Sequence, residues 1–453
     1  MLLPEKNDTI VALASARGPA GVAVVRLSGP RARELGWRHF DPRTPADKPP
    51  PRKLILGRVL DGEGKPLDEA LLVYFPAQAS YTGEPVVEFQ LHGSPLIVEE
   101  LLDALVHAGA RPAEAGEFTR RAFLSGRIDL SQAEAVADLI AAKSRVAARA
   151  AHRRLTGALS EQVGQMQRAL VAAMALLEAE IDFPEEQIGR VDPAEVTARL
   201  DEALQGADSL LAGHDRARLL ARGAVVVIAG RPNAGKSSLL NRLAGSRRAL
   251  VHEQAGTTRD LIEADVVVEG VPVKLIDTAG LRTPEHEVER QGIDLARETI
   301  ASADLTIYLI DGEAGATDED RGNVEALDPP HRVVAWNKAD LVEPDDAFTD
   351  YGDLAVSALT GFGVAELGNL LVKKLGAESA GGEALLATVR QRELVERARR
   401  CLLAAREIAA GGRDHELAAE ELREAAQALA GVIGETTTEQ VLDVIFSRFC
   451  VGK

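Results

Sequence analysis

The sequence predicts a multidomain α+β and α/β protein: an N-terminal α+β domain, a helical bundle domain, and an inserted P-loop domain with a doubly wound, mostly parallel sheet. Three observations carry this. The 453 residues suffice for about three domains. The texture changes from short β-type runs to an Ala-rich helical pattern, which returns near the C-terminus. Between the two helical stretches, a continuous apolar run leads directly into a glycine-rich loop.

The composition is that of an acidic soluble protein. Lys and Arg total 52 against 70 Asp and Glu, the net charge is -18, and 46% of residues are apolar. Disordered chains are apolar-poor, and histone-like proteins are strongly cationic, so both classes are excluded. Two cysteines, Cys401 and Cys450, fit a reducing compartment. No apolar run approaches the ~18 residues that a membrane-spanning helix needs. We expect a cytoplasmic protein without membrane association.

Residues 1–119 are predicted to form the N-terminal domain. Short β-type runs occupy residues 21–27, 54–60, 71–75 and 86–91. Ser94 is placed to cap a helix with Pro95 at its first position and Gly109 beyond its end. We expect an α+β domain with mostly antiparallel strands.

Residues 120–219 and 379–453 are predicted to form the two parts of the helical domain. Apolar residues recur at three- and four-residue steps along one stretch, which indicates a long amphipathic helix ending at Asp182-Phe183-Pro184. They are Val163, Met166, Leu170, Met174, Leu177 and Ile181. Residues 220–378 would then be an inserted domain of ordinary size.

The insert opens with the apolar run 224–229, suited to a buried parallel strand. The loop 230–237 follows, and a helical pattern starts with Ser238. In such a loop, backbone N–H groups around Asn233, Ala234 and Gly235 turn onto phosphate oxygens, and the helix N-terminus adds positive potential. Lys236 is expected to reach the β- and γ-phosphates, and the Ser237 hydroxyl to ligate Mg²⁺.

Four further motifs occur at the expected places downstream. Thr257 and Thr258 stand where a switch threonine completes the Mg²⁺ shell, and Asp277-Thr278-Ala279-Gly280 follows a strand-like run. Asn337-Lys338-Ala339-Asp340 follows another, and its Asp340 can accept the N1 and N2 hydrogens of guanine. Ser357-Ala358-Leu359 is expected to place a backbone amide on guanine O6. The sequence therefore predicts a GTP-binding domain.

These motifs and the flanking domains resemble the tRNA modification GTPase family known as MnmE or TrmE. The most specific segments inside the insert are 230–237, 255–260, 277–282 and 287–290. Outside it they are 80–84, 116–119, 121–124 and 449–453. The resemblance covers essentially the whole chain.

The resemblance implies a GTP-hydrolysing homodimer whose N-terminal domain binds folate and dimerises. With a flavin-bound partner protein, such enzymes install an aminomethyl or carboxymethylaminomethyl group on C5 of the wobble uridine of certain tRNAs. The one-carbon unit would come from a reduced folate, 5-formyl- or methylene-tetrahydrofolate. The residues that match the family's folate contacts are Arg26, Glu88, Arg127 and Lys453. Cys450 and Lys453 are expected on a flexible tail that reaches another domain.

Hydrolysis needs a group that positions water, and Leu281 after Gly280 has no hydrogen-bonding side chain. The resemblance implies a K⁺ ion beside the β–γ bridge, held by Asn233 with His252, Gln254 and Thr257 around it. It also implies that Glu289 orients the water, with Glu287 as an internal control. The expected catalytic set is Glu289, Lys236 and Gly280; the expected Mg²⁺ ligands are Ser237 and Thr258.

Two other functions remain open. One is a regulatory RNA-associated GTPase in ribosome assembly. Such proteins usually carry a basic RNA-binding domain after the GTPase domain, whereas residues from 384 onward show a second helical pattern with balanced, acidic charge. The other is a folate-dependent one-carbon transferase with a regulatory GTPase. The acidic charge predicts that tRNA binds mainly through the complex with the partner.

Overall fold

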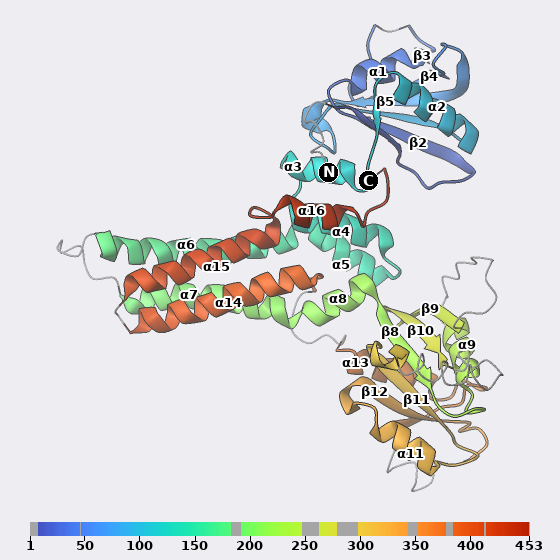
Figure 1. Ribbon diagram of the computed structural model, residues 1–453, viewed down its shortest axis with the longest axis vertical. Coiled ribbons are helices and arrows are strands. Elements are labelled where there is room, and N and C mark those ends of the chain that lie inside the picture. Colours follow the sequence, from blue (N-terminus) through green and yellow to red (C-terminus); the bar gives the residue numbers. More distant parts are fainter. Residues whose placement is uncertain are drawn as a thin grey trace. The chain divides into compact units, whose positions relative to one another are not determined.

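The computed structural model (Figure 1) describes residues 8–45, 47–182, 192–246, 262–278, 298–342, 352–376, 384–411 and 414–452. It divides into two compact units. The first contains residues 1–137 and 433–453, and the second contains residues 138–432. This division groups residues 120–137 and 433–453 with the N-terminal segment, and it groups the predicted helical domain and the predicted insert in one unit.

A seven-stranded sheet with the order β3-β4-β5-β6-β2-β1-β7 is the centre of the first unit. All neighbouring strands are antiparallel except β1 and β7, as an α+β domain predicts. The strands are β1 (Ile10–Leu13), β2 (Ala20–Ser28), β3 (Phe40–Pro42), β4 (Ile55–Leu60), β5 (Pro66–Phe75), β6 (Val86–Gly93) and β7 (Arg111–Pro112). Their alternating pattern buries one face, where Leu27, Leu72 and Phe89 are fully covered.

Two helices contribute to that core. They are α1 (Ala32–Arg38) and α2 (Pro95–His107), and a 3₁₀ turn, η1 (Ala77–Ala79), follows β5. Helix α2 begins after Ser94 as predicted, but the Ser94 side chain makes no capping hydrogen bond. Its carbonyl instead accepts from Val98 N at 3.0 Å. The predicted role of the Ser94 hydroxyl is therefore wrong, while the helix start is right.

The C-terminal segment completes the first unit. Helix α16 (Glu439–Phe446) lies with α3 (Glu117–Leu124) and α4 (Leu130–Ala141), as Figure 1 shows. Leu130, Phe446 and Phe449 are buried together in one apolar cluster. This cluster explains why residues 433–453 belong with the N-terminal unit.

Long helices form a bundle in the second unit. They are α6 (Ala158–Asp182), α7 (Pro193–Ala212), α14 (Val389–Ala410) and α15 (His415–Ile433). Helix α7 packs against both α6 and α14. Two ion pairs of 2.5 Å, Arg399–Asp208 and Arg406–Asp201, also join α14 to α7. Chain segments on either side of the insert therefore share one bundle. Two shorter helices, α5 (Arg145–Leu155) and α8 (His214–Arg222), pack against each other.

The insert contains a six-stranded sheet with the order β13-β12-β11-β8-β10-β9. Only β9 is antiparallel to its neighbour. The strands are β8 (Ala224–Ala229), β9 (Ile262–Val268), β10 (Val271–Asp277), β11 (Leu305–Asp311), β12 (Arg332–Asn337) and β13 (Leu354–Ala355). The flanking helices are α9 (Lys236–Ser246), α11 (Asp318–Glu325) and α13 (Val364–Lys374), with the 3₁₀ turn η3 (Pro329–His331).

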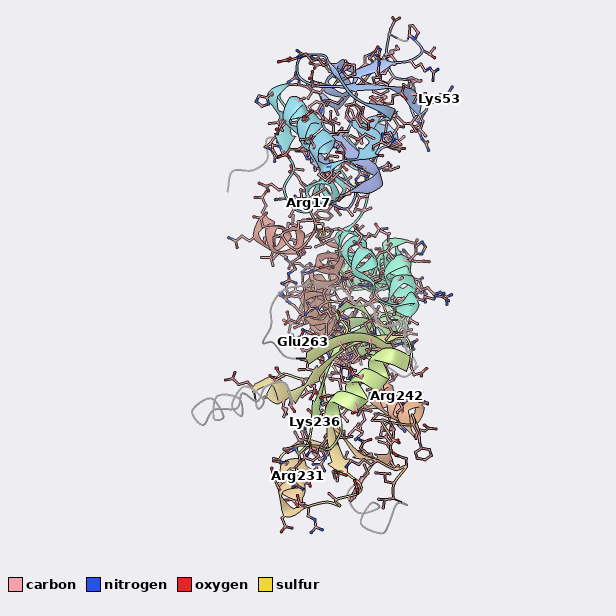
Figure 2. All side chains as sticks on the ribbon, turned by 90° about the vertical axis from the view of Figure 1, so that its right-hand side faces the viewer. Arg17, Lys53, Arg231, Lys236, Arg242 and Glu263 are labelled. Carbon is pink, nitrogen blue, oxygen red and sulfur yellow. The ribbon has the colours of Figure 1, made fainter. Side chains whose placement is uncertain are left out.

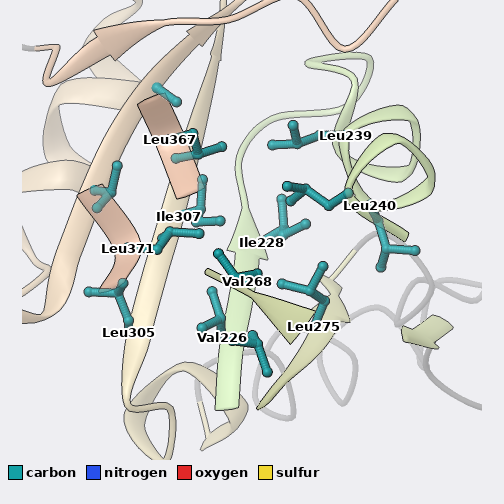
Figure 3. Packing of buried hydrophobic residues seen from close by; sticks show 14 of the residues in the cluster. Val226, Ile228, Leu239, Leu240, Val268, Leu275, Leu305, Ile307, Leu367 and Leu371 are labelled. Carbon is teal, nitrogen blue, oxygen red and sulfur yellow. The ribbon is translucent and has the colours of Figure 1, made fainter. Parts of the chain in front are cut away.

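The core of this sheet is aliphatic (Figure 3). Val226, Ile228, Leu275 and Ile307 on three adjacent strands pack with Leu239 of α9. The continuous apolar run that predicted a buried parallel strand is β8, which lies inside the sheet between β10 and β11. Among the helices in the described ranges, none combines the length and the apolarity needed to span a bilayer.

Candidate functional site

The predicted nucleotide motifs meet at one edge of the six-stranded sheet. The P-loop follows β8, Asp277 ends β10, and Asn337 ends β12. These strands run in the same direction through β11, so their carboxyl ends lie at the same edge. The strand order reverses at β8, because the chain continues to β10 on one side and β11 on the other. Ligands of doubly wound sheets bind at such a point.

Left-handed backbone conformations shape the P-loop. Gly230, Asn233 and Gly235 have φ of 142°, 66° and 91°. A β-carbon on Gly235 would collide with the side-chain amide of Asn337, so only glycine fits there. Lys236 is 6% exposed, and its ammonium donates to the carbonyls of Gly230 at 2.9 Å and Arg231 at 2.7 Å. The ammonium group is thus held close to the loop.

A cavity of about 1450 Å³ opens beside this loop. Its P-loop side is lined by residues of the predicted P-loop and of the start of α9, together with Thr278 of the next motif. These are Gly230, Asn233, Gly235, Lys236, Ser237 and Ser238. The cavity is large enough for a nucleotide, since small-molecule sites have about 300–1,000 Å³.

Ser237, one of the predicted Mg²⁺ ligands, is in direct contact with Asp277 of the next motif. Ser237 Oγ donates to Asp277 Oδ2 at 2.5 Å, and Asp277 is fully buried at the end of β10. Thr278 Oγ1 donates to the Ile228 carbonyl at 3.0 Å, which fastens the Asp277 motif to β8. A hydroxyl and a carboxylate are the hard oxygen donors that Mg²⁺ takes.

The base-recognition motifs also come together. Ser357 Oγ donates to Asp340 Oδ1 at 2.5 Å, and Asp340 is exposed. Asn337 is buried and bridges two loops: its Nδ2 donates to the Ala234 carbonyl at 2.8 Å, and its Oδ1 accepts from Ala358 N at 2.9 Å. The Asn337 amide therefore connects the P-loop to the Ser357-Ala358-Leu359 loop.

Lys338 adopts a left-handed conformation with φ of 64°. Its ammonium pairs with Asp311 at 2.7 Å and Glu313 at 3.1 Å, and these contacts raise its pKa. The Lys338 side chain is therefore oriented along the end of β11 rather than toward the P-loop.

Two arginines without a predicted role belong to this site (Figure 2). Arg242 of α9 donates from Nε to the Ala358 carbonyl at 2.9 Å and also contacts the Leu359 carbonyl. Arg231 of the P-loop donates to Thr317 Oγ1 at 3.3 Å and lies 3.6 Å from Asp320. The partners of Arg242 are more than 100 residues away, so no local pattern could have indicated its role.

Several predicted residues lie outside the described residues. They are Thr257, Thr258, His252, Gln254, Ala279, Gly280, Leu281, Glu287, Glu289 and Lys453. Their assigned roles in Mg²⁺ and K⁺ binding, water positioning and folate binding stay predictions.

The predicted folate residues are partly assembled in the first unit. Arg26 of β2 and Glu88 of β6 face each other in register, and Arg26 Nε donates to Glu88 Oε1 at 2.7 Å. The guanidinium also lies 5.6 Å from the centre of the Phe118 ring. Both charged side chains are only 16–17% exposed, so they form a sheltered pair rather than solvated strand charges.

Arg127 follows α3, and its Nη1 donates to the Gln78 carbonyl at 3.3 Å in the segment between β5 and β6. In that segment, Tyr81 forms a 3.0 Å hydrogen bond with Thr119. Burial raises the pKa of Tyr81, while the Thr119 hydrogen bond and the Arg26 charge lower it. The structure therefore brings Arg26 and Glu88 together, with Tyr81 within electrostatic reach.

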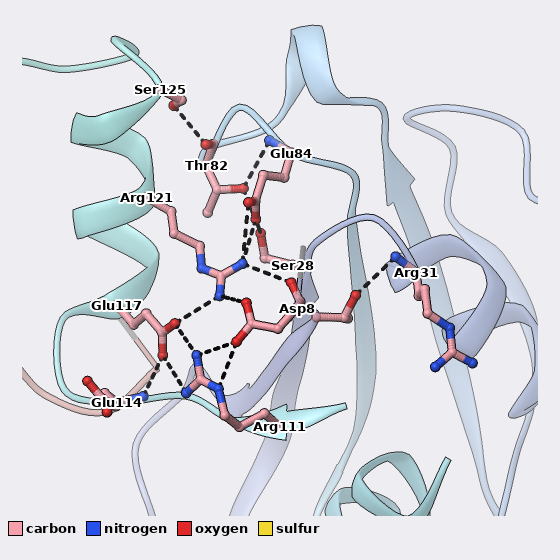
Figure 4. A network of polar contacts seen from close by, with 11 residues as sticks. Asp8, Ser28, Arg31, Thr82, Glu84, Arg111, Glu114, Glu117, Arg121 and Ser125 are labelled. Atoms are coloured by element: carbon pink, nitrogen blue, oxygen red, sulfur yellow. Dashed lines mark hydrogen bonds and ion pairs between the residues drawn. The ribbon is translucent and has the colours of Figure 1, made fainter. Parts of the chain in front are cut away.

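A network of ion pairs holds this region together (Figure 4). Glu117 is 3% exposed and accepts from Arg111 at 2.6 Å and Arg121 at 2.9 Å. Asp8 pairs with the same two arginines, and Arg121 also reaches Glu84 at 3.1 Å. Burial raises the pKa of Glu117 and of Asp8, but the arginine hydrogen bonds outweigh it, so both values are lowered.

The C-terminal tail is held in place up to Gly452, which corrects the expectation of a flexible tail. Val451 forms a β-bridge with Ala115, and Gly116 N donates to the Cys450 carbonyl at 3.4 Å. A β-carbon on Gly452 would collide with the Leu13 carbonyl. The glycine therefore allows the tail to lie against the N-terminal sheet.

Two family models match the chain. The model described as the MnmE helical domain matches residues 130–450, and that described as the GTP-binding protein TrmE N-terminus matches residues 9–127. The tRNA modification GTPase MnmE of Azoarcus sp. (strain BH72) is 44% identical over 99% of both chains. The protein of the same name from Aquifex aeolicus (strain VF5) is 39% identical over 99% of this chain and 100% of its own.

Among solved structures, the G domain of the T. maritima FeoB iron transporter matches 33% of this chain and 98% of its own. Its sequence identity is 24% and its TM-score is 0.26. Aquifex aeolicus Era bound to GDP and AlF4- matches 40% of this chain and 67% of its own, at 21% identity and a TM-score of 0.28.

Proposed function

Because this chain belongs to the MnmE family of tRNA modification GTPases, we propose that its GTP hydrolysis drives modification of C5 of the wobble uridine in certain tRNAs. The product would carry an aminomethyl or carboxymethylaminomethyl group. The enzyme would act in the cytoplasm as a homodimer with a flavin-bound partner protein, and tRNA would bind mainly through that complex. The full-length similarity to relatives named tRNA modification GTPases is the observation that carries this proposal.

The nucleotide site supports the hydrolytic half. We assign the phosphates of GTP to the P-loop amides and to Lys236, whose ammonium already lies at that loop. Ser237 and Thr258 would ligate Mg²⁺ directly, and Asp277, which now accepts a hydrogen bond from Ser237, would hold the ion through water. Mg²⁺ would neutralise charge that develops between the β- and γ-phosphates. Since the Ser237 proton bridges the two oxygens in this structure, metal binding would replace that bond.

Base recognition falls to Asp340 in this proposal. A carboxylate accepts both N1–H and N2–H₂ of guanine, and adenine presents no such pair of donors. Ser357 fixes one of the two carboxylate oxygens, which sets the plane of the group before the base arrives. Arg242 and Asn337 hold the loop 357–359, and one backbone amide of this loop is the proposed donor to guanine O6; Ala358 N itself donates to Asn337 Oδ1.

We assign water positioning to Glu289 and charge neutralisation to a K⁺ ion held partly by Asn233. Asn233 is exposed at the P-loop with φ of 66°, so its side chain is free to extend from the loop toward a cation. Amide and backbone oxygens are suitable ligands for such an ion. A fixed cation beside the β–γ bridge lowers the barrier as other electrostatic stabilisers do.

We assign the reduced folate to the Arg26–Glu88 pair, with Arg127 and Lys453 as further contacts. Among the described residues, the second carboxylate oxygen of Glu88 and the terminal nitrogens of Arg26 have no hydrogen-bond partner. A sheltered carboxylate can accept from the amino and ring N–H edge of a pterin, and a sheltered guanidinium can bind a carboxylate of the glutamyl tail. Both chemistries belong to a tetrahydrofolate.

Nucleoside analysis of tRNA from cells that lack this protein tests the proposal. We expect the C5 modification of wobble uridine to disappear, and to return with the wild-type gene but not with a Lys236→Ala variant. Unchanged wobble uridines in the deletion strain would refute it. The ribosome-assembly alternative instead predicts altered ribosomal subunit profiles with intact wobble uridines.

A further inference from the structure

Helix α5 carries the most one-sided charge in the part of the chain that the structure describes. Residues 143–155 contain Lys143, Arg145, Arg149, Arg153 and Arg154 with His152, and no Asp or Glu. The chain as a whole has a net charge of -18. Ser144 starts the helix by accepting from Ala147 N at 3.0 Å. A cationic helix of this kind is therefore a local exception to the acidic chain.

All cations of α5 except Arg154 occupy the face opposite its packed side. Ala147, Ala151 and Arg154 are buried. The exposed residues Arg145, Arg149, His152 and Arg153 lie half a turn away, within an arc of about 100° at roughly 100° per residue. Successive arginines at steps of four residues are roughly 6 Å apart along the axis. The exposed face is thus a row of positive charge.

Carboxylates pair with two cations outside this exposed row, Lys143 before the helix and Arg154 on its packed side. Lys143 pairs with Asp265 at 2.8 Å, and buried Arg154 pairs with Asp138 at 2.7 Å. Across the ranges that are described, Arg145 and Arg149 have no ion pair.

The bundle arginines behave differently. On α14, Arg397, Arg399 and Arg406 each pair with a carboxylate of a neighbouring helix at 2.5–2.7 Å. The exposed arginines at the centre of α5 are therefore not used to hold helices together.

The adjacent helix extends the positive surface. Helix α8 packs against α5 and ends at exposed Arg222, which has no ion pair with any described residue. Arg218 of the same helix forms an ion pair with Asp304 at 3.2 Å. Arg222 thus adds a further available cation near the row.

We propose that the exposed face of α5, centred on Arg145 and Arg149, binds the phosphate backbone of tRNA. This inference rests on the proposed function and names the part of this chain that contacts the nucleic acid. A regular row of guanidinium groups suits phosphates, because each group can donate two parallel hydrogen bonds to one phosphate. The face has no aromatic or large aliphatic residue at its centre, whereas protein interfaces have an apolar core.

The acidic charge of the rest of the chain limits the places where a nucleic acid can bind. Because the chain as a whole is acidic, a nucleic acid is attracted only to local cationic surfaces, and the α5 face is one of them among the described residues. Few phosphate contacts give weak binding with a shallow salt dependence. The patch therefore agrees with the expectation that the partner protein contributes most of the tRNA affinity.

The test measures binding of a fluorescent tRNA transcript with a wobble uridine to the full chain over a series of salt concentrations. The variant is Arg145→Gln/Arg149→Gln. The matched control is Arg168→Gln/Arg400→Gln, two exposed arginines of α6 and α14 without ion pairs among the described residues, which changes the net charge equally. GTP hydrolysis checks that both variants fold, because neither pair lies in the nucleotide site.

We expect the α5 variant to bind about 10-fold more weakly and the slope of log Kd against log salt to fall by about 2, one for each lost phosphate contact. The control should match the wild type. An unchanged slope, or an equal loss in the control, would overturn the proposal. The proposal would also be overturned if the α5 variant bound tRNA normally but no longer co-purified with the flavin-bound partner. In that case α5 would contact the partner protein rather than tRNA.

Analysis of wobble nucleosides in the deletion strain distinguishes failure of the α5 proposal from failure of the proposed function. A wild-type chain that binds no tRNA, in cells whose wobble modification still depends on it, would overturn only the α5 proposal.

Discussion

At the residue scale, Asp340 owes its orientation to one short hydrogen bond. Ser357 Oγ donates to Oδ1 at 2.5 Å and leaves the exposed Oδ2 to solvent. Specificity for guanine would therefore depend on a carboxylate whose plane is already fixed. A site built around paired hydrogen bonds rejects a base that lacks the donors, because its own groups stay unpaired.

We expect Asp340→Asn to weaken GTP binding by about 100-fold or more, since two charge-assisted hydrogen bonds contribute roughly 1.5–3 kcal/mol each. The amide NH₂ of Asn would face a donor of guanine. Xanthosine triphosphate presents a carbonyl at that position and should bind the variant better than GTP does. Calorimetric titration of both nucleotides checks this. Ser357→Ala should cost only several-fold, and equal GTP affinity in Asp340→Asn would remove the residue from base recognition.

Glu117 is the residue on which the N-terminal network depends. Its lowered pKa means that its stabilisation is present above the ordinary value of 4.5 and is lost as pH falls through the lower folded value. Asp8, whose pKa is lowered from 3.8, acts in the same direction. The first unit should therefore keep its stability from neutral pH to about pH 5 and lose it in acid.

We expect Glu117→Gln to lower the unfolding free energy of the first unit by about 3 kcal/mol at pH 7, because it leaves two arginines short of a charge. The variant should also lose less stability on acidification than the wild type. Denaturant titration followed by Trp37 fluorescence, in a Trp336→Phe background, reports this unit. The control Glu34→Gln breaks only an exposed pair with Arg31 and should change little. A parallel pH dependence in variant and wild type would contradict the assignment.

At the element scale, the site is an arrangement of loops at the ends of β8, β10 and β12. Each motif follows its strand, and side chains then join the loops. Ser237 joins the P-loop to the Asp277 motif, and Asn337 joins it to the Ala358 loop. The rigid sheet therefore sets the spacing of the loops, and the hydrogen bonds between them set their orientation.

Replacing Asn337 tests this coupling of loops. Asn337→Ala leaves the buried Ala234 carbonyl and Ala358 amide without partners, and we expect a loss of about 3 kcal/mol in stability of the second unit. GTP affinity should fall as well, because both loops contact the nucleotide in the proposed complex. Asn337→Asp keeps the acceptor for Ala358 N and should recover part of both losses. Thermal unfolding with and without GTP is the measurement, and an Ala variant with wild-type GTP affinity would contradict the role.

At the scale of the whole molecule, the sequence predicted what is encoded locally. The alternating runs of the first sheet, the apolar strand β8 and the nucleotide motifs each depend on neighbouring residues, so they could be read in order. The Arg111–Asp8 and Arg121–Asp8 hydrogen bonds span 103 and 113 residues, and no local pattern indicates them. The roles of Arg242 and of the fixed tail were missed for the same reason. The pairing of Arg26 with Glu88 required knowledge of the strand register, which the sequence leaves open.

The two units have separate cores, so their sites should respond separately to substitution. Leu27, Leu72 and Phe89 belong to one core, and Val226 and Leu275 to another. We expect Glu88→Ala to weaken binding of a reduced folate by about 10-fold, as loss of a charged hydrogen bond implies, with GTP hydrolysis nearly unchanged. The control is Glu69→Gln on exposed β5 surface. Unchanged folate affinity by calorimetry would remove Glu88 from the site.

Hydrolysis is the property most dependent on the assembled molecule. Leu281 stands where many GTPases have a water-positioning Gln, and in the proposed mechanism a cation and a carboxylate supply what that side chain would. We expect faster turnover in K⁺ than in Na⁺ at equal ionic strength, with G domains of two chains pairing to complete the site. Glu289→Ala should lower the hydrolysis rate by about 100-fold with little loss of GTP affinity, since a positioned acid–base group contributes at that level. Glu287 lies in the same acidic run, so Glu287→Ala should leave the rate nearly unchanged. Single-turnover rates separate the two halves: equal rates in the two salts would exclude the cation, and a fully active Glu289→Ala protein would exclude the carboxylate.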